Sequence, residues 1–354
     1  MTGTLESDRT KGALRGRRRP VAIGTDLVTA HRPNGKAFAP VRIEPTRPDL
    51  DLSAWIANNR SAIEGDLLAH GAVLFRGFAV RNGEEFWAAV DAQGVELMHY
   101  AEAATPRTEL GRHLYTSTEF PADQTIALHN ENSSAAIWPM KLWLYCETPA
   151  ERGGETPLAD VRRVLARIPG SVRETFARKG WAVVRNFRDG LGLSWRAAFR
   201  TDEPREVERY CALNQTEWEW RGADCLRTIQ RRPAIRTHPT TGEAVWFNHM
   251  AFWHPFSLDP VMRRTLEMEF EPLELPYGTF YGDLSTIPDE VVAEVCSAYQ
   301  SETITFPWQA GDVVLVDNML VAHGRLPFTG KRRVLVMMGQ PSSPVASNRV
   351  ESPT

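Results

Sequence analysis

The 354-residue sequence contains only four cysteines, and no two of them form a CxxC pair. They are Cys146, Cys211, Cys225 and Cys296. Closely spaced cysteines mark secreted disulfide scaffolds and thiolate zinc sites, whereas scattered ones are typical of reduced thiols in the cytosol. We therefore expect a cytoplasmic protein whose thiols have no catalytic role.

The sequence also lacks a strong excess of charge and any long apolar segment. Its formal net charge is −3 and its pI is near 6.3, so no overall positive field favours nucleic acid. No apolar run approaches the roughly 20 residues of a membrane helix. The basic segment Arg15–Arg19 is not followed by the apolar region of a secretory signal. We expect neither a nucleic acid nor a membrane as a partner.

With 42% apolar and 24% charged residues, the composition is that of an ordinary globular protein. No Pro/Gly/Ser-rich linker divides the chain, which favours a single domain over residues 21–345. Residues 1–20 are predicted to be a disordered basic tail, and residues 346–354 a second tail. The segment 168–240 interrupts the succession of strands with helical stretches, four tryptophans and a charged run, Arg227–Arg232. We interpret this segment as an insertion that lies over the core.

Short apolar runs between turn residues predict strands, and apolar residues at helical spacing predict helices between them. The expected strands are residues 37–44, 71–78, 141–146, 244–248, 303–306, 312–317 and 333–338. The expected helices are residues 52–70, 84–93, 161–167, 261–270 and 289–299. Strands dominate both ends of the chain, and helices flank them. A mainly β fold, a jelly-roll type sandwich or barrel with helical decoration, fits this distribution.

A histidine and a carboxylate lie two residues apart at His129 and Glu131. If this segment is a β-strand, both side chains point to one face and can reach one metal ion. His323 is the best candidate for a third ligand, because Asp317–Asn318 and a short loop would present it at a strand end. Two histidines and one carboxylate on one face leave open coordination positions, as in non-haem Fe(II) oxygenases. Hydrolytic zinc sites use the same ligands and are the alternative.

Two further features indicate that an anion binds beside this metal. Arg333 opens an apolar strand and could point into the barrel, where a guanidinium holds a carboxylate through two parallel hydrogen bonds. Thr156, after the double glycine Gly153–Gly154, could donate its hydroxyl to the same anion. Arg332 is the alternative, because strand alternation lets only one of the two arginines face inward. A surface ion pair for Arg333 and a turn role for Thr156 are the structural alternatives.

These motifs resemble those of the TauD/TfdA family of Fe(II)- and 2-oxoglutarate-dependent dioxygenases. The elements His129–Glu131, Gly153–Thr156 and His323–Phe328 occur in family order and spacing. Within the family the chain is similar to the SyrP-like branch of hydroxylases from antibiotic and nonribosomal peptide biosynthesis. The stretches that support this branch are Gly192–Trp195, Val245–His249, Leu275–Asp283 and Phe306–Asp312.

The resemblance implies a double-stranded β-helix (jelly-roll) core of the clavaminate-synthase-like kind, with Fe(II), 2-oxoglutarate and O₂ as cofactors. The implied iron ligands are His129, Glu131 and His323. Many family members carry Asp where this chain has Glu131, but the group is still a carboxylate. Arg333, or its neighbour Arg332, would bind the distal carboxylate of 2-oxoglutarate, with help from Thr156.

The implied reaction couples decarboxylation of 2-oxoglutarate, to succinate and CO₂, with hydroxylation of an unactivated C–H bond. The branch points to an amino acid or aminoacyl group in secondary metabolism, either free or tethered to a carrier protein. With the same cofactors, the alternatives are desaturation, epoxidation or oxidative cyclisation of a small molecule. A zinc hydrolase and a non-catalytic binder of a small acid are further alternatives. The sequence does not decide between a monomer and a homo-oligomer.

Five polar residues are candidates for contacts with the substrate, each with a structural alternative. His249 lies in an aromatic cluster and is either a substrate contact or a satisfied core histidine. Asn130 and Asn248 could bind a polar substrate or stabilise turns. Arg227 could bind a substrate carboxylate or belong to a solvated charged face. Arg325 could belong to the polar cluster around the co-substrate.

Overall fold

The structure is a computed structural model that describes residues 27–35, 37–99, 108–117, 120–188, 190–222 and 224–343. The two predicted tails, residues 1–20 and 346–354, lie outside the described residues. No helix in the described part of the chain is both long and apolar enough to cross a membrane.

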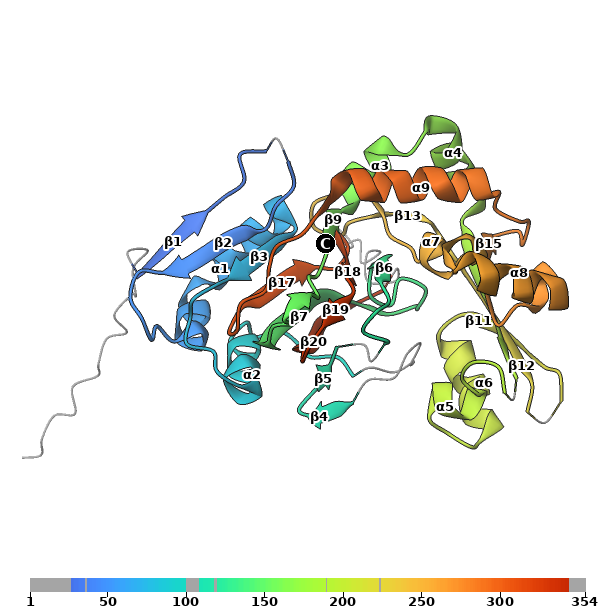
Figure 1. Ribbon diagram of the computed structural model, residues 1–354, viewed down its shortest axis with the longest axis horizontal. Coiled ribbons are helices and arrows are strands. Elements are labelled where there is room, and N and C mark those ends of the chain that lie inside the picture. The colour runs from blue at the N-terminus through green and yellow to red at the C-terminus, as the bar shows by residue number, and fades with distance from the viewer. Residues whose placement is uncertain are drawn as a thin grey trace, which may run out of the picture.

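The largest sheet has eight strands in the order β1-β2-β3-β17-β7-β20-β5-β4 (Figure 1). Their bounds are β1 Val28–His31, β2 Val41–Pro45, β3 Ala72–Phe75, β17 Val313–Asp317, β7 Trp138–Thr148, β20 Arg333–Ser342, β5 Leu114–Thr116 and β4 Glu109–Gly111. The pairs are antiparallel except for β2 and β3, which are parallel. The central strand β7 is buried on both faces, so it is a continuous apolar run rather than an alternating one.

A second sheet of four antiparallel strands has the order β16-β9-β18-β6. Its strands are β16 Thr303–Ile304, β9 Leu158–Asp160, β18 Val321–Arg325 and β6 Ile126–His129. Leu142 and Leu144 of β7 share one apolar core with Leu158 and Ala322 of this sheet. The two sheets therefore form a sandwich, which confirms the predicted β core.

Helices cover the outer surfaces of the sandwich. Trp143 and Tyr145, on the other face of β7, pack in a second core with α1 and α2. The helices of this part are α1 Leu52–His70, α2 Gly83–Asp91, α3 Val161–Arg167, α4 Gly170–Lys179 and α9 Asp289–Glu302. The α1 helix ends at Gly71, whose φ of 77° a residue with a side chain would adopt only under strain. Four of these helices lie where the apolar spacing predicts them, at 52–70, 84–93, 161–167 and 289–299.

A third sheet, with the order β11-β12-β10-β15, stands at one side of the sandwich (Figure 1). Its strands are β11 Thr216–Trp220, β12 Leu226–Arg232, β10 Trp181–Phe187 and β15 Tyr277–Tyr281. The helices around it are α5 Trp195–Phe199, α6 Pro204–Leu213, α7 Met250–Trp253 and α8 Pro260–Glu269, with short 3₁₀ helices at Pro255–Ser257 and Pro272–Glu274. Two small antiparallel pairs complete the fold. One is the hairpin of β13 Ile235–Thr237 and β14 Ala244–Trp246, and the other joins β19 Phe328–Thr329 with β8 Arg152–Gly153, which lies far away in the sequence.

The third sheet corrects the prediction that residues 168–240 interrupt the strands of the fold. Three strands of this sheet lie inside that segment, and the charged run Arg227–Arg232 is part of β12. Alternate residues of β12 are buried and half-buried, so the strand has the period of two that a sheet requires. The arginines at half-buried positions hide this period from an analysis based on apolar residues alone.

Candidate functional site

His129 and His323 face each other across two neighbouring strands. His129 is the last residue of β6 and pairs directly with His323 of β18, and their ring centroids are 4.5 Å apart. The next residue, Gly324, makes this approach possible, because a Cβ there would lie 2.5 Å from the carbonyl oxygen of Ile126. A glycine beside His323 thus allows β18 to lie against β6.

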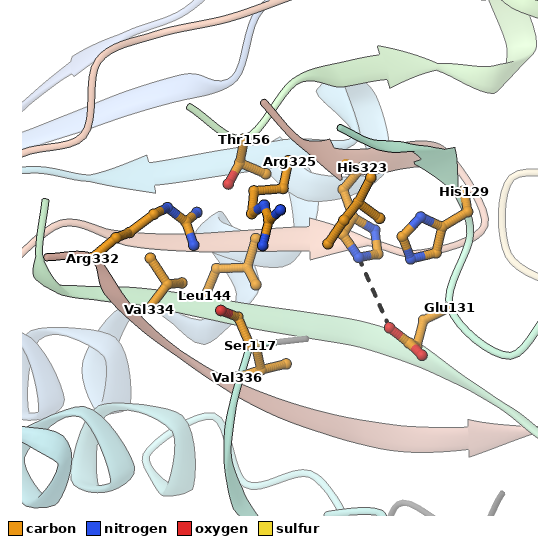
Figure 2. Close-up of a pocket in the computed structure, with 12 residues that line it drawn as sticks. Ser117, His129, Glu131, Leu144, Thr156, His323, Arg325, Arg332, Val334 and Val336 are labelled. Atoms are coloured by element: carbon orange, nitrogen blue, oxygen red, sulfur yellow. Dashed lines mark ion pairs between the residues drawn. The ribbon is translucent and has the colours of Figure 1, made fainter. Parts of the chain in front are cut away.

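Glu131 reaches the two histidines from a turn rather than from a strand. The predicted strand ends at His129, so the same-face argument for His129 and Glu131 is wrong for this backbone. The turn nevertheless brings Glu131 Oε2 to 3.9 Å from His323 Nε2. One ligand atom from each of the three residues lies within 4.8 Å of the others, and all three side chains are buried. Figure 2 shows this convergence at one end of a cavity.

The donor chemistry of these three residues fits a divalent iron. His129 Nδ1 lies 2.8 Å from the carbonyl oxygen of Ala127, which can only accept, so Nδ1 carries the hydrogen. This hydrogen bond fixes the tautomer in which Nε2 offers its lone pair to a metal. Two imidazoles and one carboxylate are the ligand set of non-haem Fe(II) sites. When bound there, Fe(II) would supply the site at which O₂ is activated.

Asn318 holds the Glu131 turn in place, a role that the sequence analysis missed. Its side-chain Oδ1 accepts from the Glu131 backbone N–H at 2.7 Å, and its Nδ2 donates to the Glu131 carbonyl at 2.9 Å. Asn318 Nδ2 also lies 2.8 Å from the carbonyl of Pro139, and Asn318 is fully buried. In the sequence, the only indication of this role was the position of Asn318 shortly before the strand β18. Asn318 therefore connects the Glu131 turn to the strand that carries His323.

Replacing Asn318 with alanine is expected to weaken Fe(II) binding by about 10- to 100-fold, the usual cost of losing a residue that orients a metal ligand. It should also destabilise the fold by roughly 1–3 kcal/mol, because buried polar groups lose their partner. The matched control is Asn186→Ala, since Asn186 also donates to buried carbonyls, those of Leu273 and Leu275, but in the third sheet. Urea unfolding and anaerobic Fe(II) titration would separate the two effects. Wild-type iron affinity in Asn318→Ala would contradict this role.

The other end of the same cavity, about 40 Å³ in volume, is basic. Arg332, Arg325 and Thr156 line the same cavity as His129, Glu131 and His323 (Figure 2). Arg332 Nε donates to the carbonyl of Gly154 at 2.9 Å. Gly154 has a φ of +73°, and a Cβ there would lie 2.9 Å from Arg332 Cδ. The double glycine thus leaves room for the Arg332 side chain.

The electrostatics of this end favour an anion. Burial, together with the charge of Arg325, lowers the pKa of Arg332 to about 10. Burial also lowers the pKa of Arg325, whose guanidinium donates to the backbone carbonyls of Phe120, Pro121 and Gln124. A carboxylate between Arg332 and Arg325 would offset this desolvation. Thr156 Oγ1 accepts from Trp308 Nε1 at 3.1 Å, so its hydrogen is directed elsewhere.

Arg333 does not face the cavity, so the prediction that it is the inward arginine is wrong. Half of its side chain is exposed, and its Nε forms an ion pair with Glu147 at 2.9 Å. Arg332, the residue before β20, lines the cavity together with Val334 and Val336. Arg332, named from the sequence as the alternative, therefore takes the position expected of Arg333.

Three of the residues predicted to contact the substrate have structural partners instead. Asn130 is buried and donates to the carbonyl of Asn318 at 2.7 Å. Asn248 is bonded to the backbone of Ala234 and Met250, as expected for the turn alternative. Neither asparagine lines the cavities that contain Glu131.

The third of these residues, Arg227, points to the far face of the third sheet. It donates to Asn186 Oδ1 at 2.8 Å and to the carbonyl of Leu273, and it forms an ion pair with Glu274. Arg325, by contrast, lines the cavity beside the metal ligands. The structure therefore keeps Arg325 and removes Arg227 from the candidate site.

His249 is placed at the boundary of the metal centre. Its Nδ1 lies 2.5 Å from Ser133 Oγ, and its ring centroid is 5.3 Å from that of His129. Together with Glu131, His249 lines a second, larger cavity of about 230 Å³. Glu131 lines both cavities, whereas Arg325 and Arg332 line only the first of the two.

Comparisons with known proteins agree with this geometry. Residues 35–338 match the family described as "Taurine catabolism dioxygenase TauD, TfdA family". The chain is 41% identical to the dapdiamide synthesis protein DdaC of Enterobacter agglomerans, over 80% of this chain and 86% of that protein. It is 31% identical to a clavaminate synthase-like protein of Arabidopsis thaliana, over 77% of this chain and 83% of that protein.

Two solved structures of PvcB share the fold. The PvcB protein from Pseudomonas aeruginosa superposes with a TM-score of 0.53 and 16% identity, over 93% of this chain and 95% of that chain. A second structure, described as an Fe, alpha-ketoglutarate dependent oxygenase from an isonitrile synthetic pathway, gives a TM-score of 0.51 and 15% identity over the same shares. At these identities the likeness concerns the fold, and it agrees with the predicted jelly-roll core.

Proposed function

The chain belongs to the TauD, TfdA family and is an Fe(II)- and 2-oxoglutarate-dependent dioxygenase, and we propose that it hydroxylates an unactivated C–H bond of an amino acid or aminoacyl group. In this proposal His129, Glu131 and His323 hold the iron. Arg332, assisted by Thr156, holds the distal carboxylate of 2-oxoglutarate.

The observation that carries these assignments is one cavity with two chemically different ends. Three metal-ligating atoms within 4.8 Å of one another form one end, and the half-buried Arg332 with the Thr156 hydroxyl forms the other. A molecule with a 2-oxo acid at one terminus and a carboxylate at the other is complementary to both ends at once. A zinc hydrolase would give Arg332 and Thr156 no function.

The nature of the substrate is supported by relatives and by the volume of the second cavity. The relative DdaC is described as a dapdiamide synthesis protein, and PvcB as an oxygenase of an isonitrile pathway. Both descriptions place similar proteins in the synthesis of specialised metabolites. A cavity of about 230 Å³ next to Glu131 suits a group of amino-acid size. Engineered cavities of about 150 Å³ already hold benzene.

Succinate release in the presence of candidate substrates tests this function. The purified protein, with Fe(II), 2-oxoglutarate and air, would be given the common amino acids as free acids and as small thioesters that imitate carrier-tethered groups. We expect at least one form to raise succinate above the substrate-free rate and to give a product with one added oxygen atom.

The two forms of the panel separate the free from the tethered substrate. Turnover of a thioester but not of the matching free acid would support a carrier-bound aminoacyl group. A product that has lost two hydrogen atoms would contradict hydroxylation in favour of desaturation or cyclisation. Succinate that never exceeds the substrate-free rate would contradict the proposed substrate class.

A further inference from the structure

The far wall of the second cavity is built by the third sheet. Glu131 and His249 line the cavity on the side of the metal ligands. Arg185, Gln230 and Tyr277, from β10, β12 and β15, line it from the sheet. A molecule in this cavity therefore lies between the carboxylate ligand of the metal and a buried arginine.

The register of the sheet fixes which side chains face this cavity. Arg185 pairs with Tyr277 of β15, and Val183, two residues earlier, pairs with Gln230 of β12. Directly paired residues, and residues two apart on one strand, lie on the same face of a sheet. These four residues therefore form one surface, and all four line the cavity.

The same register separates Arg185 from Arg227. Arg227 pairs with Asn186, the residue after Arg185, so it lies on the opposite face of the sheet. Its contacts with Asn186, Leu273 and Glu274 confirm that orientation. The sheet thus directs one arginine into the cavity and the other away from it.

Arg185 is held in a geometry suited to an oxyanion. It is only 5% exposed, and its guanidinium lies over the rings of Phe187 and Tyr277, 4.5 Å and 4.9 Å from their centroids. Its Nη2 donates to the Tyr277 hydroxyl at 2.9 Å. Ring contacts of this kind fix the plane of a guanidinium, and the N–H donors at its edge match the two oxygens of a carboxylate. The Tyr277 hydroxyl, which accepts from Arg185, is positioned to donate to the same group.

We propose that Arg185 and Tyr277 bind a carboxylate of the substrate, and so determine which class of molecule is oxidised. The substrate would carry this carboxylate at the end of the molecule remote from the C–H bond that reacts, in a cavity that Gln230 also lines. The inference rests on the proposed function, because it gives the second cavity to the substrate. In this proposal Arg185 binds the substrate carboxylate, in place of Arg227, which was the candidate from the sequence.

A binding experiment without turnover tests this proposal. Under nitrogen, the protein with Fe(II) and 2-oxoglutarate would be titrated with each common amino acid and with its primary amide, in which the α-carboxylate is replaced. For the dicarboxylic amino acids, the side-chain amides would be tested as well. Binding beside the iron is read from the change in the visible charge-transfer band of the iron–2-oxoglutarate complex. We expect at least one free acid to change the band, and the amide that lacks the relevant carboxylate to bind at least about 30-fold more weakly.

Variants then assign the effect to Arg185. Arg185→Met should weaken binding of the active acid by at least about 30-fold, with the band of the iron–2-oxoglutarate complex still present. Arg227→Met, on the other face of the same sheet, should bind the acid as the wild type does. Tyr277→Phe removes one hydroxyl and keeps the ring, and it should weaken binding of the acid severalfold. This variant tests the same site if Arg185→Met does not fold.

The possible failures are distinguishable. If the charge-transfer band never forms, the cofactor assignment fails. If the band forms but no acid changes it, or if acids and amides bind equally well, the carboxylate site is contradicted. Unchanged acid binding in Arg185→Met and Tyr277→Phe would contradict the assignment to these residues, while succinate formation could still support the proposed function.

Discussion

Replacing Arg332 with methionine should weaken 2-oxoglutarate binding by about 30- to 1,000-fold or more, whereas replacing Arg333 with methionine should leave it within about fivefold of wild type. The expected loss is large because the distal carboxylate of 2-oxoglutarate would then lack its charged partner in the cavity. Truncating one member of such a pair costs roughly 2–5 kcal/mol. Arg333 is half-exposed and paired with Glu147 on the surface, where ion pairs contribute about 0–1 kcal/mol.

Anaerobic calorimetric titration of each iron-loaded variant with 2-oxoglutarate measures this difference. The two arginines are adjacent in sequence and identical in chemistry, so each variant is the control for the other. Arg332→Lys adds a third comparison, because lysine keeps the charge but not the two parallel donors, and an intermediate affinity is expected. A large loss in Arg333→Met with none in Arg332→Met would reverse the assignment.

Replacing His323 with alanine should lower Fe(II) affinity by more than about 100-fold, since even the residues that orient metal ligands contribute 10- to 100-fold. The remaining His129 and Glu131 offer two donors instead of three. Equilibrium dialysis with Fe(II) under nitrogen would measure the affinity. Circular dichroism would confirm that the variant is folded.

Glu131→Asp is the matched control for the loss of a ligand. It shortens the side chain but keeps the carboxylate, so we expect measurable Fe(II) binding, weaker than in wild type and stronger than in His323→Ala. Glu131→Ala, in contrast, should lose iron to the same extent as His323→Ala. Equal Fe(II) affinity in wild type, His323→Ala and Glu131→Ala would place the metal elsewhere.

The ligand residues could be predicted from the sequence because their chemistry is explicit in the residue types. The spacing of His129 and Glu131, together with His323 after Asp317–Asn318, suggested a metal centre. The backbone conformation that brings these three residues together was predicted less well. The turn at Glu131 depends on hydrogen bonds to Asn318, 187 residues away, and no local pattern reveals such a contact.

The choice between Arg332 and Arg333 illustrates a second limit. Alternation states that one of two adjacent residues faces inward, but only the register of β20 against its neighbours decides which one. The register shifts between Arg333 and Val334, so the strand has no regular start from which to count. Because Arg332 and Arg333 have the same side chain, the residue type does not indicate which of them faces the cavity.

The cavity wall formed by the third sheet was predicted incompletely for a related reason. The arginines of β12 resemble a solvated charged face, and the strand was therefore read as part of an insertion. In the structure, β12 brings Gln230 onto the cavity face and Arg227 onto the opposite face. Arg185 lies in the buried strand β10, where the sequence shows only one cation among apolar residues. Its function becomes visible only when β10 and β15 are placed side by side.

The most direct test of the central claim is an anaerobic titration of the apoprotein with Fe(II) and then with 2-oxoglutarate. Iron held by His129, Glu131 and His323, with 2-oxoglutarate extending toward Arg332, predicts a weak visible charge-transfer band that appears only when both are present. The band should be absent in His323→Ala, and in Arg332→Met it should require far more 2-oxoglutarate. A folded wild-type protein that binds Fe(II) without developing this band, or a band that persists in His323→Ala, would contradict the account.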